Sequence, residues 1–394
     1  MPHLRTLSGG ESHGKAIIGI VDGLPSNLPI EAEDINVDLK RRQMGYGRGG
    51  RMKIESDRVE FLSGVRWGKT LGSPITLKID NRDWKNWESG MSDDAAKSGS
   101  IAAVTKPRPG HADLPGVIKY GFKDVRNVLE RSSARETAGR VAVGALCKKF
   151  IGEFGIKIGS YVINIGGVGR RYSGVDTADS AALKLLYESA EKSDVRCPYP
   201  EDSKRMVCAI DEAKEQGDTL GGIFEVFALN VPTGLGSHTQ WDKRLDGLLA
   251  QSLMAIQAVK GVETGLGFDM AVRPGSQVMD EIFYEKGSGF LRKTNNCGGV
   301  EGGISNGMPI VIRGAMKPIP TQRKPLRSVD IETKSPVEAA YERSDVCAVP
   351  ACAVIAEAVT AITIADLMLT KFGGDTMDET ISNFNKYMEY ISEF

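Results

Sequence analysis

The sequence predicts a fold in which α-helices and β-strands are mixed. Short apolar runs closed by turn residues indicate strands, as at 16–21, which Asp-Gly-Leu-Pro follows. Longer segments with apolar residues at helical spacing end at a glycine, as at 133–154. The 394 residues are 41% hydrophobic, which suffices for one large domain or two average ones.

The first quarter of the chain is predicted to combine strands with one helix. That helix starts after Pro29, has acidic residues in its first turn and basic residues in its last, and stops before Gly45. Two further strands are expected at 52–65, where apolar residues alternate, and at 73–79. The segment 84–104 is polar and rich in small residues, so it is expected on the surface.

Two longer helices are predicted in the middle of the chain. The helix at 133–154 would begin next to the hydroxyl and guanidinium groups of 131–135, an arrangement that can hold an anion. An amphipathic helix at 242–260 would end at Gly261. The polar stretch 189–217 between them is expected at the periphery.

Composition excludes several classes of protein. The formal charge is −1, whereas a protein that coats nucleic acid has a broad excess of basic residues. No uninterrupted apolar run of about 18 residues and no secretion signal is found, so a cytoplasmic protein without a membrane span is expected. The six cysteines lack paired spacing and predict reduced core thiols, and no motif indicates a metal.

Two histidines and one basic segment are the candidates for chemistry. His13 and His111 each lie next to glycine in a polar segment, where a ligand can approach the backbone and a proton can be transferred near neutral pH. Four arginines stand among four glycines in 41–51, which suits a ligand with several negative charges. Considered alone, each histidine would more often be structural, and His3 and His238 have no such setting.

One pattern occurs twice. Gly-Val-x-x-Gly-x-x-x-Gly-x-Pro-Ile stands at 64–75 and again at 299–310, and each copy leads into a predicted strand. An ancient duplication would explain the match. Chance is the alternative in a chain with 46 glycines.

Longer motifs follow one another along the chain in a specific order. They are GESHG at 10–14, RRQMGYGRG at 41–49, RPGHAD at 108–113, ERSSARET at 130–137, NNCGGVEGG at 295–303, MKPIPT at 316–321 and ERSD at 342–345. In this order they resemble the chorismate synthase family, and the resemblance runs from about residue 7 to about residue 371.

The resemblance implies an α+β fold in which helices lie between two largely antiparallel sheets. It implies a single domain over 1–394, with pseudo-duplicated halves at about 1–165 and 218–375 if the repeat is real. A homotetramer is expected by analogy with the family.

The resemblance also implies a reaction. The family converts 5-enolpyruvylshikimate 3-phosphate to chorismate by a 1,4-elimination of phosphate, in which the two bonds break on opposite faces of the ring. This carbon–oxygen lyase reaction serves aromatic amino acid biosynthesis through the shikimate pathway. It requires reduced FMN without net redox change, and NADPH is a possible reductant of the flavin.

Site residues follow from the matching positions. His13 is expected to assist phosphate departure, His111 to lie beside the flavin and Asp345 to relay a proton, although which histidine serves which group is open. The substrate anions are expected to bind Arg42, Arg48, Arg108, Ser133, Arg135 and Arg343. The flavin is expected to contact Arg42, Arg48, Arg131, Ser132, Ser133, Gln257, Ala258, Gly302, Lys317, Pro318, Ile319, Pro320, Thr321 and Arg343.

Two other functions remain as alternatives. A flavin oxidoreductase would use the same anion sites but needs a nicotinamide site, and Gly166-Gly167-x-Gly169 lacks the acidic residue and helix start of a dinucleotide site. An RNA-binding module would explain the Arg-Gly segment, but such segments are usually repeated and disordered.

Overall fold

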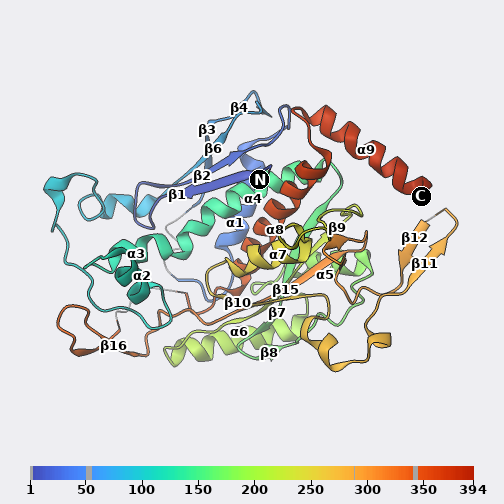
Figure 1. The fold of residues 1–394 in the computed structure, drawn as a ribbon. Coiled ribbons are helices and arrows are strands. Elements are labelled where there is room, and N and C mark those ends of the chain that lie inside the picture. Colours follow the sequence, from blue (N-terminus) through green and yellow to red (C-terminus); the bar gives the residue numbers. More distant parts are fainter. Residues whose placement is uncertain (1–2, 50–55, 288, 340–344) are drawn as a thin grey trace.

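The computed structural model describes residues 3–49, 56–287, 289–339 and 345–394. These residues form an α+β fold with two main antiparallel sheets (Figure 1), so the predicted mixture of helices and strands is confirmed. The part of the strand predicted at 52–65 that falls on 52–55 lies outside the described residues. Its described part contains a strand only from Val59.

The first sheet comes from the N-terminal quarter of the chain. Its strand order is β1-β2-β6-β3, and all neighbours are antiparallel. Residues on β2 and β6 alternate between a buried and a less buried face, as expected for a sheet covered on one side. The strands are β1 (Arg5–Gly9), β2 (Ala16–Asp22), β3 (Val59–Ser63) and β6 (Ile75–Asp80).

The second sheet has five strands in the order β10-β15-β9-β7-β8. Its three central strands are almost completely buried, because helices cover parts of both faces. The strands are β7 (Lys157–Ile165), β8 (Val168–Gly169), β9 (Gly222–Leu229), β10 (Val259–Thr264) and β15 (Ile310–Met316).

Two long helices, α4 (Thr137–Gly152) and α8 (Val349–Phe372), pack against each other in the core. Helix α4 contacts β2 and β6 of the first sheet, and α8 contacts β7 and β9 of the second (Figure 1). Gly144 allows the close crossing, because a Cβ there would lie 2.4 Å from the Cβ of Ala358. The helices α1 (Ala32–Gln43) and α7 (Leu245–Met254) also contact α8.

The remaining helices and hairpins surround this core. The helices are α2 (Asp113–Tyr120), α3 (Arg126–Ser132), α5 (Ser180–Ala190), α6 (Pro200–Glu215) and α9 (Met377–Glu393). The hairpins pair β4 (Val65–Arg66) with β5 (Lys69–Thr70), β11 (Ile282–Glu285) with β12 (Gly289–Arg292), β13 (Val300–Glu301) with β14 (Ile304–Ser305) and β16 (Arg327–Val329) with β17 (Pro336–Glu338).

The two copies of the repeated glycine pattern adopt the same local structure. Each makes a short hairpin, β4–β5 or β13–β14, and Gly64 and Gly299 both have a φ of +80°. The hydroxyl at the end of each hairpin donates to a proline carbonyl and accepts from a leucine N–H. The donor distances are 2.6 Å for Thr70 to Pro25 and 2.6 Å for Ser305 to Pro232.

Helix α8 is long and apolar enough to cross a membrane by length and composition, which the search for uninterrupted apolar runs did not reveal. However, 83% of its most apolar window is buried inside the fold. This burial, and the contact with α4 and both sheet strands β7 and β9, identify it as a core helix.

Two predicted helices are shorter than expected. The segment 133–154 contains a one-turn 3-10 helix at Ala134–Glu136 before α4 starts, so residues 131–133 lie at the end of α3 and not at the start of a long helix. The segment 242–260 ends as helix at Met254, and Gly261 lies inside β10. In both places the helix gives way to a strand or to contacts in the candidate site, and hydrophobic periodicity does not predict such tertiary contacts.

Candidate active site

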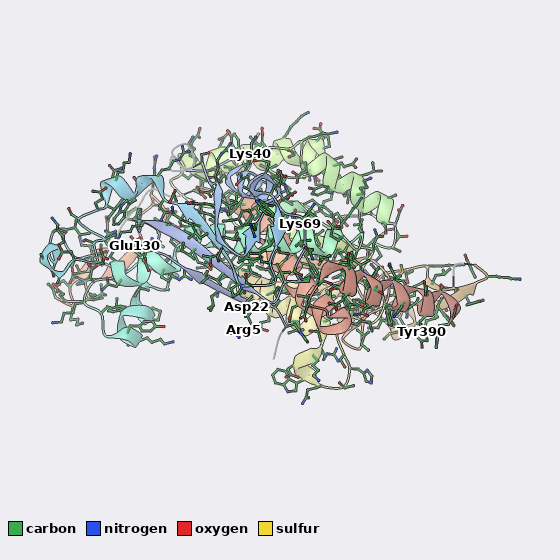
Figure 2. All side chains as sticks on the ribbon, turned by 90° about the horizontal axis from the view of Figure 1, so that it is seen from above. Arg5, Asp22, Lys40, Lys69, Glu130 and Tyr390 are labelled. Atoms are coloured by element: carbon green, nitrogen blue, oxygen red, sulfur yellow. The ribbon has the colours of Figure 1, made fainter. Side chains whose placement is uncertain are left out.

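His13 lies in the loop between β1 and β2 and is held by Glu130 of α3. The backbone N–H of His13 donates to Oε2 of Glu130 at 2.7 Å, and its ring Nδ1 lies 2.8 Å from Oε1. The ring of Trp87 packs against the imidazole with 4.3 Å between centroids. Figure 2 shows Glu130 at the end of the first sheet that is opposite to Arg5 and Asp22.

A buried carboxylate joins two of the predicted anion-binding arginines. Asp57 accepts from Arg42 Nη2 at 2.8 Å and from Arg135 Nη1 at 2.6 Å. Burial opposes ionisation of Asp57, but the charges of both guanidinium groups outweigh it and lower the pKa of this carboxyl. Arg135 Nε also donates to Asn81 at 2.7 Å, and Ser133 accepts from the Ser12 hydroxyl at 3.1 Å.

Arg41, which precedes Arg42 in helix α1, fixes the end of this helix that carries Arg42. Arg41 donates to Glu357 of α8 at 2.8 Å and to Glu191 at 2.7 Å. Burial opposes this charge, but the carboxylates raise the pKa of Arg41. The C-terminus of α1, and with it Arg42, is therefore tied to the core.

The basic segment after α1 is fixed by Asp345. Its carboxylate lies 3.3 Å from Arg48 Nε and accepts from the Gly49 N–H at 2.6 Å. Gly47 has a φ of +82°, and a Cβ there would lie 2.9 Å from Ile210, so glycine is required. Arg343, which was predicted beside Asp345, lies outside the described residues.

His111 belongs to a second cluster. Its Nδ1 lies 2.5 Å from Oδ1 of Asp113, and Arg108 donates to Oδ2 of the same carboxylate at 2.9 Å. Burial opposes ionisation of Asp113, but hydrogen bonds from His111 and Arg108 hold its pKa far below the usual range. Arg108 Nη1 also donates to Thr321 at 3.1 Å.

The predicted flavin segment 317–321 lies beside this cluster. The N–H of Lys317 donates to the carbonyl of Ala258 at 2.9 Å, and its ammonium group donates to the carbonyl of Gly110. The carbonyl of Ile319 accepts from Thr219 at 2.7 Å. These contacts bring β10, β15 and the His111 segment together.

Gln257 and its neighbour Ala258 connect the two clusters, because Ala258 accepts from Lys317, whose ammonium group contacts Gly110 beside His111. Gln257 donates to Glu136 at 3.0 Å, and Glu136 follows Arg135 of the first cluster. Arg131 donates to the carbonyl of Gly10 at 3.0 Å. Ser132 donates to a carbonyl of its own helix at 3.4 Å.

Gly302 is the predicted position that the described contacts do not bring to either cluster. It lies in the turn between β13 and β14 with a φ of +58°, and a Cβ there would meet nothing within 4 Å.

Two buried polar atoms fit an anionic cofactor or substrate. Nε of Arg42 and Oε1 of Gln257 are buried and have no hydrogen-bond partner among the described residues. A phosphate or carboxylate would satisfy the first, and an N–H group of a ring would satisfy the second. The residues present are therefore compatible with a bound flavin and a polyanionic substrate.

Sequence reasoning missed the acidic partners of the basic residues. Glu130 directly precedes Arg131 in one motif, and Asp113 follows His111 by two residues in another. Their spacing could therefore have predicted acidic partners for the basic residues of the site. Asp57 and Trp87 had no such signal, because only the tertiary fold brings them to Arg42 and His13.

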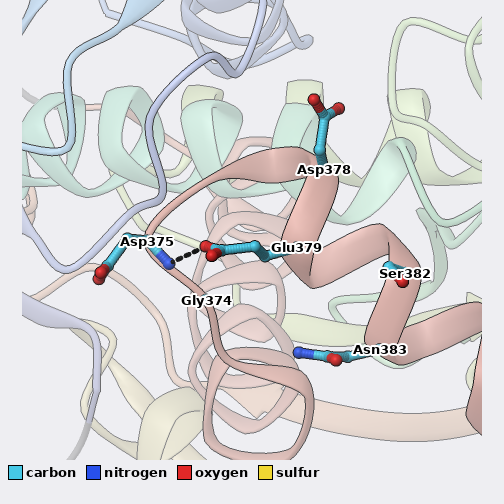
Figure 3. Close-up of a pocket in the computed structure, with 6 residues that line it drawn as sticks. All are labelled: Gly374, Asp375, Asp378, Glu379, Ser382 and Asn383. Carbon is cyan, nitrogen blue, oxygen red and sulfur yellow. Dashed lines mark hydrogen bonds between the residues drawn. The ribbon is translucent and has the colours of Figure 1, made fainter.

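A separate surface pocket of about 580 Å³ lies where α8 leads into α9 (Figure 3). Three of its lining residues are acidic, and none belongs to the predicted site. Negative charge there would repel a substrate that carries phosphate and carboxylates. The pocket is lined by Gly374, Asp375, Asp378, Glu379, Ser382 and Asn383.

Comparison with known proteins agrees with this geometry. The chorismate synthase family model matches residues 4–369. The chorismate synthases of Aquifex aeolicus (strain VF5) and Syntrophotalea carbinolica are each 58% identical over 394 residues, covering 100% of this chain and 99% and 100% of theirs. A crystal structure of chorismate synthase is similar with a TM-score of 0.82 and 49% identity, covering 99% of each chain. The chain belongs to the chorismate synthase family.

Proposed function

We propose that this site performs the family's reaction, the 1,4-elimination of phosphate from 5-enolpyruvylshikimate 3-phosphate to give chorismate. The observation that carries the proposal is that buried guanidinium groups and half-buried imidazole groups from distant segments of the chain gather in two neighbouring clusters. Arg42 and Arg135 share Asp57, although they are 93 residues apart in sequence. Such a density of cations suits a substrate with one phosphate and two carboxylates.

His13 is the group proposed to assist phosphate departure. Protonated imidazole can donate a proton to, or stabilise, a leaving phosphate. Asn81 links Arg135 to the loop of His13, because it accepts from Arg135 and donates to the carbonyls of Glu11 and Gly14, and this link supports the role.

His111 and Asp345 are proposed to serve the flavin. The role of His111 is supported by its place beside the segment 317–321. Arg108 contacts Thr321 of this segment, and Lys317 of the segment contacts Gly110, which precedes His111. Asp345 is supported by its contact with Arg48, a residue that the resemblance assigns to both substrate and flavin.

The family requires a reduced flavin, and reduced FMN is the flavin proposed for this chain. Arg42, Arg48, Arg131, Gln257 and the segment 317–321 would hold it, with Ser132, Ser133, Ala258, Gly302 and Arg343 as further proposed contacts. The reduced flavin supplies electron density next to a carbon–hydrogen bond that is too weakly acidic for a side-chain base. NADPH as its reductant and a homotetramer are proposals from the resemblance, and a cytoplasmic location is a proposal from the sequence pattern.

A duplicated core is proposed for the fold, with α4 and α8 sandwiched between the two sheets. Its support is the shared strand order, β1-β2-β6-β3 and β7-β9-β15-β10, and the shared register, in which Ile17 pairs with Ile79 and Phe224 with Gly314. Ile79 and Gly314 follow the two copies of the repeated pattern at the same spacing, so the two pairs occupy equivalent positions. Because β7 takes the place of β1, we put the start of the second half at β7, ahead of the boundary near 218 that the sequence suggested.

Phosphate release from 5-enolpyruvylshikimate 3-phosphate tests the function. With pre-reduced FMN under anaerobic conditions, purified protein should release one phosphate for each chorismate formed and leave the flavin reduced. Oxidation of the flavin in proportion to product would indicate a net redox reaction and would contradict the proposal. Absence of phosphate release with both ligands present would also contradict it.

A further inference from the structure

We propose that Glu130 is a positioning residue that fixes the ring of His13 and keeps its Nδ1 protonated. The inference rests on the proposed function of His13, and it adds a residue to which no role has been given above. Its basis is one carboxylate that binds the same histidine twice, at the backbone N–H and at the ring.

The double contact leaves His13 little freedom. Oε2 of Glu130 accepts from the His13 backbone N–H at 2.7 Å, and Oε1 lies 2.8 Å from Nδ1. The side chain of Glu130 is only 1% exposed, so water cannot easily replace either contact. With the backbone and the ring tied to one rigid group, the torsions of the histidine side chain are defined.

The charge of Glu130 decides which ring nitrogen carries the proton. Burial opposes ionisation of Glu130, but hydrogen bonds from His13 and the charge of Arg126 lower its pKa, so it is a carboxylate at neutral pH. A carboxylate only accepts hydrogen bonds, and therefore Nδ1 must be the donor. Nε2 is then the atom that gains and loses a proton.

Trp87 and Asp83 also lie next to the His13 ring. Trp87 covers the ring at 4.3 Å with an interplanar angle of 31°, and Arg126 lies over the Trp87 ring at 4.8 Å. Asp83 has its Oδ2 4.0 Å from Nε2, and Arg126 Nη1 lies 3.4 Å from Oε1 of Glu130. Among the described residues, these contacts place the charged groups of Glu130 and Arg126 of α3 and of Asp83 of the neighbouring 3-10 helix around this histidine.

The test measures His13 directly in the ligand-free protein. Deuterium exchange at the imidazole carbon between the two nitrogens depends on ring protonation, and mass spectrometry resolves it for each of the four histidines. In Glu130→Gln the pH profile of exchange at His13 should differ from that of the parent, because Nδ1 loses a charged acceptor in contact with it. The midpoints of His111 and His238 should not move.

Two further variants separate positioning from folding. Glu130→Asp keeps the charge and should leave the His13 midpoint within about half a unit of the parent while turnover falls, because the shorter side chain cannot make both contacts. Glu225→Gln is the matched control, because Glu225 is equally buried on Arg313 at 2.8 Å but lies on β9.

Turnover gives the second readout. In Glu130→Gln, kcat should fall by about 10- to 100-fold with KM within about threefold. An unchanged His13 midpoint in Glu130→Gln overturns the proposal whatever the turnover. A shifted midpoint with normal turnover supports the positioning by Glu130 and contradicts instead the proposed role of His13.

Discussion

Replacing Asp57 with asparagine should destabilise the protein by removing a charge that two buried cations share. The Asp57 side chain is fully buried, and the side chains of Arg42 and Arg135 are 4% and 2% exposed. Asparagine offers one oxygen, so its amide N–H₂ would face the second guanidinium as donor against donor. Neither arginine can lose its proton to relieve the repulsion.

The magnitude follows from the two contacts. Each opposite charge at about 4 Å is worth about 4 kcal/mol at an effective dielectric constant of about 20, and part of this is cancelled by the desolvation of the groups. Removing one partner of a buried ion pair usually costs about 3 to 5 kcal/mol. We expect Asp57→Asn to lose about this amount of the free energy of unfolding.

Urea unfolding at a fixed protein concentration measures the loss, with Asp22→Asn as the control. Asp22 is 42% exposed and lies 3.9 Å from Arg5, so its replacement should change the stability by less than about 0.5 kcal/mol. Inorganic phosphate should restore more stability to Asp57→Asn than to the parent, because an anion can replace the lost carboxylate. A loss below about 1 kcal/mol would refute the counter-ion role of Asp57.

Three further predictions concern catalysis, packing and pH. Separate alanine variants of His13 and His111 should each lower kcat by about 10² to 10⁴ with an unchanged circular dichroism spectrum, and normal turnover in both would contradict their proposed roles. Gly144→Ala should cost about 1 to 3 kcal/mol in thermal unfolding, because its Cβ would lie 2.4 Å from α8. Gly152→Ala should be neutral or slightly stabilising, because a Cβ there meets nothing within 4 Å. Equal effects of the two substitutions would exclude the close crossing as the cause. Because the pKa of Asp113 is lowered in the fold, its carboxylate contributes stability that is complete above the ordinary pKa of 3.8 and is lost as the pH falls below that value. Asp113→Asn should therefore lose less unfolding free energy on acidification than the parent. An equal loss would contradict this prediction.

The strands and the site motifs could largely be predicted from the sequence. A buried strand such as β2 needs only local alternation and a turn, and both are written in neighbouring residues. The motifs of the basic residues were equally local. Their acidic partners were harder to find, because Asp57 stands just before β3, 78 residues from Arg135 in sequence, and meets this arginine only in the folded chain.

The helix that the sequence predicted at 133–154 shows why periodicity alone could not describe the site. In a continuous helix, Arg131 and Arg135 would be four residues apart on one face and would point the same way. Ser133 instead has an extended backbone, with a ψ of 143°, and breaks the helix between them. Arg131 consequently donates to Gly10 and Arg135 donates to Asp57, so the two arginines face different partners. The interruption that makes α4 start later than predicted is the feature that separates these two positive charges.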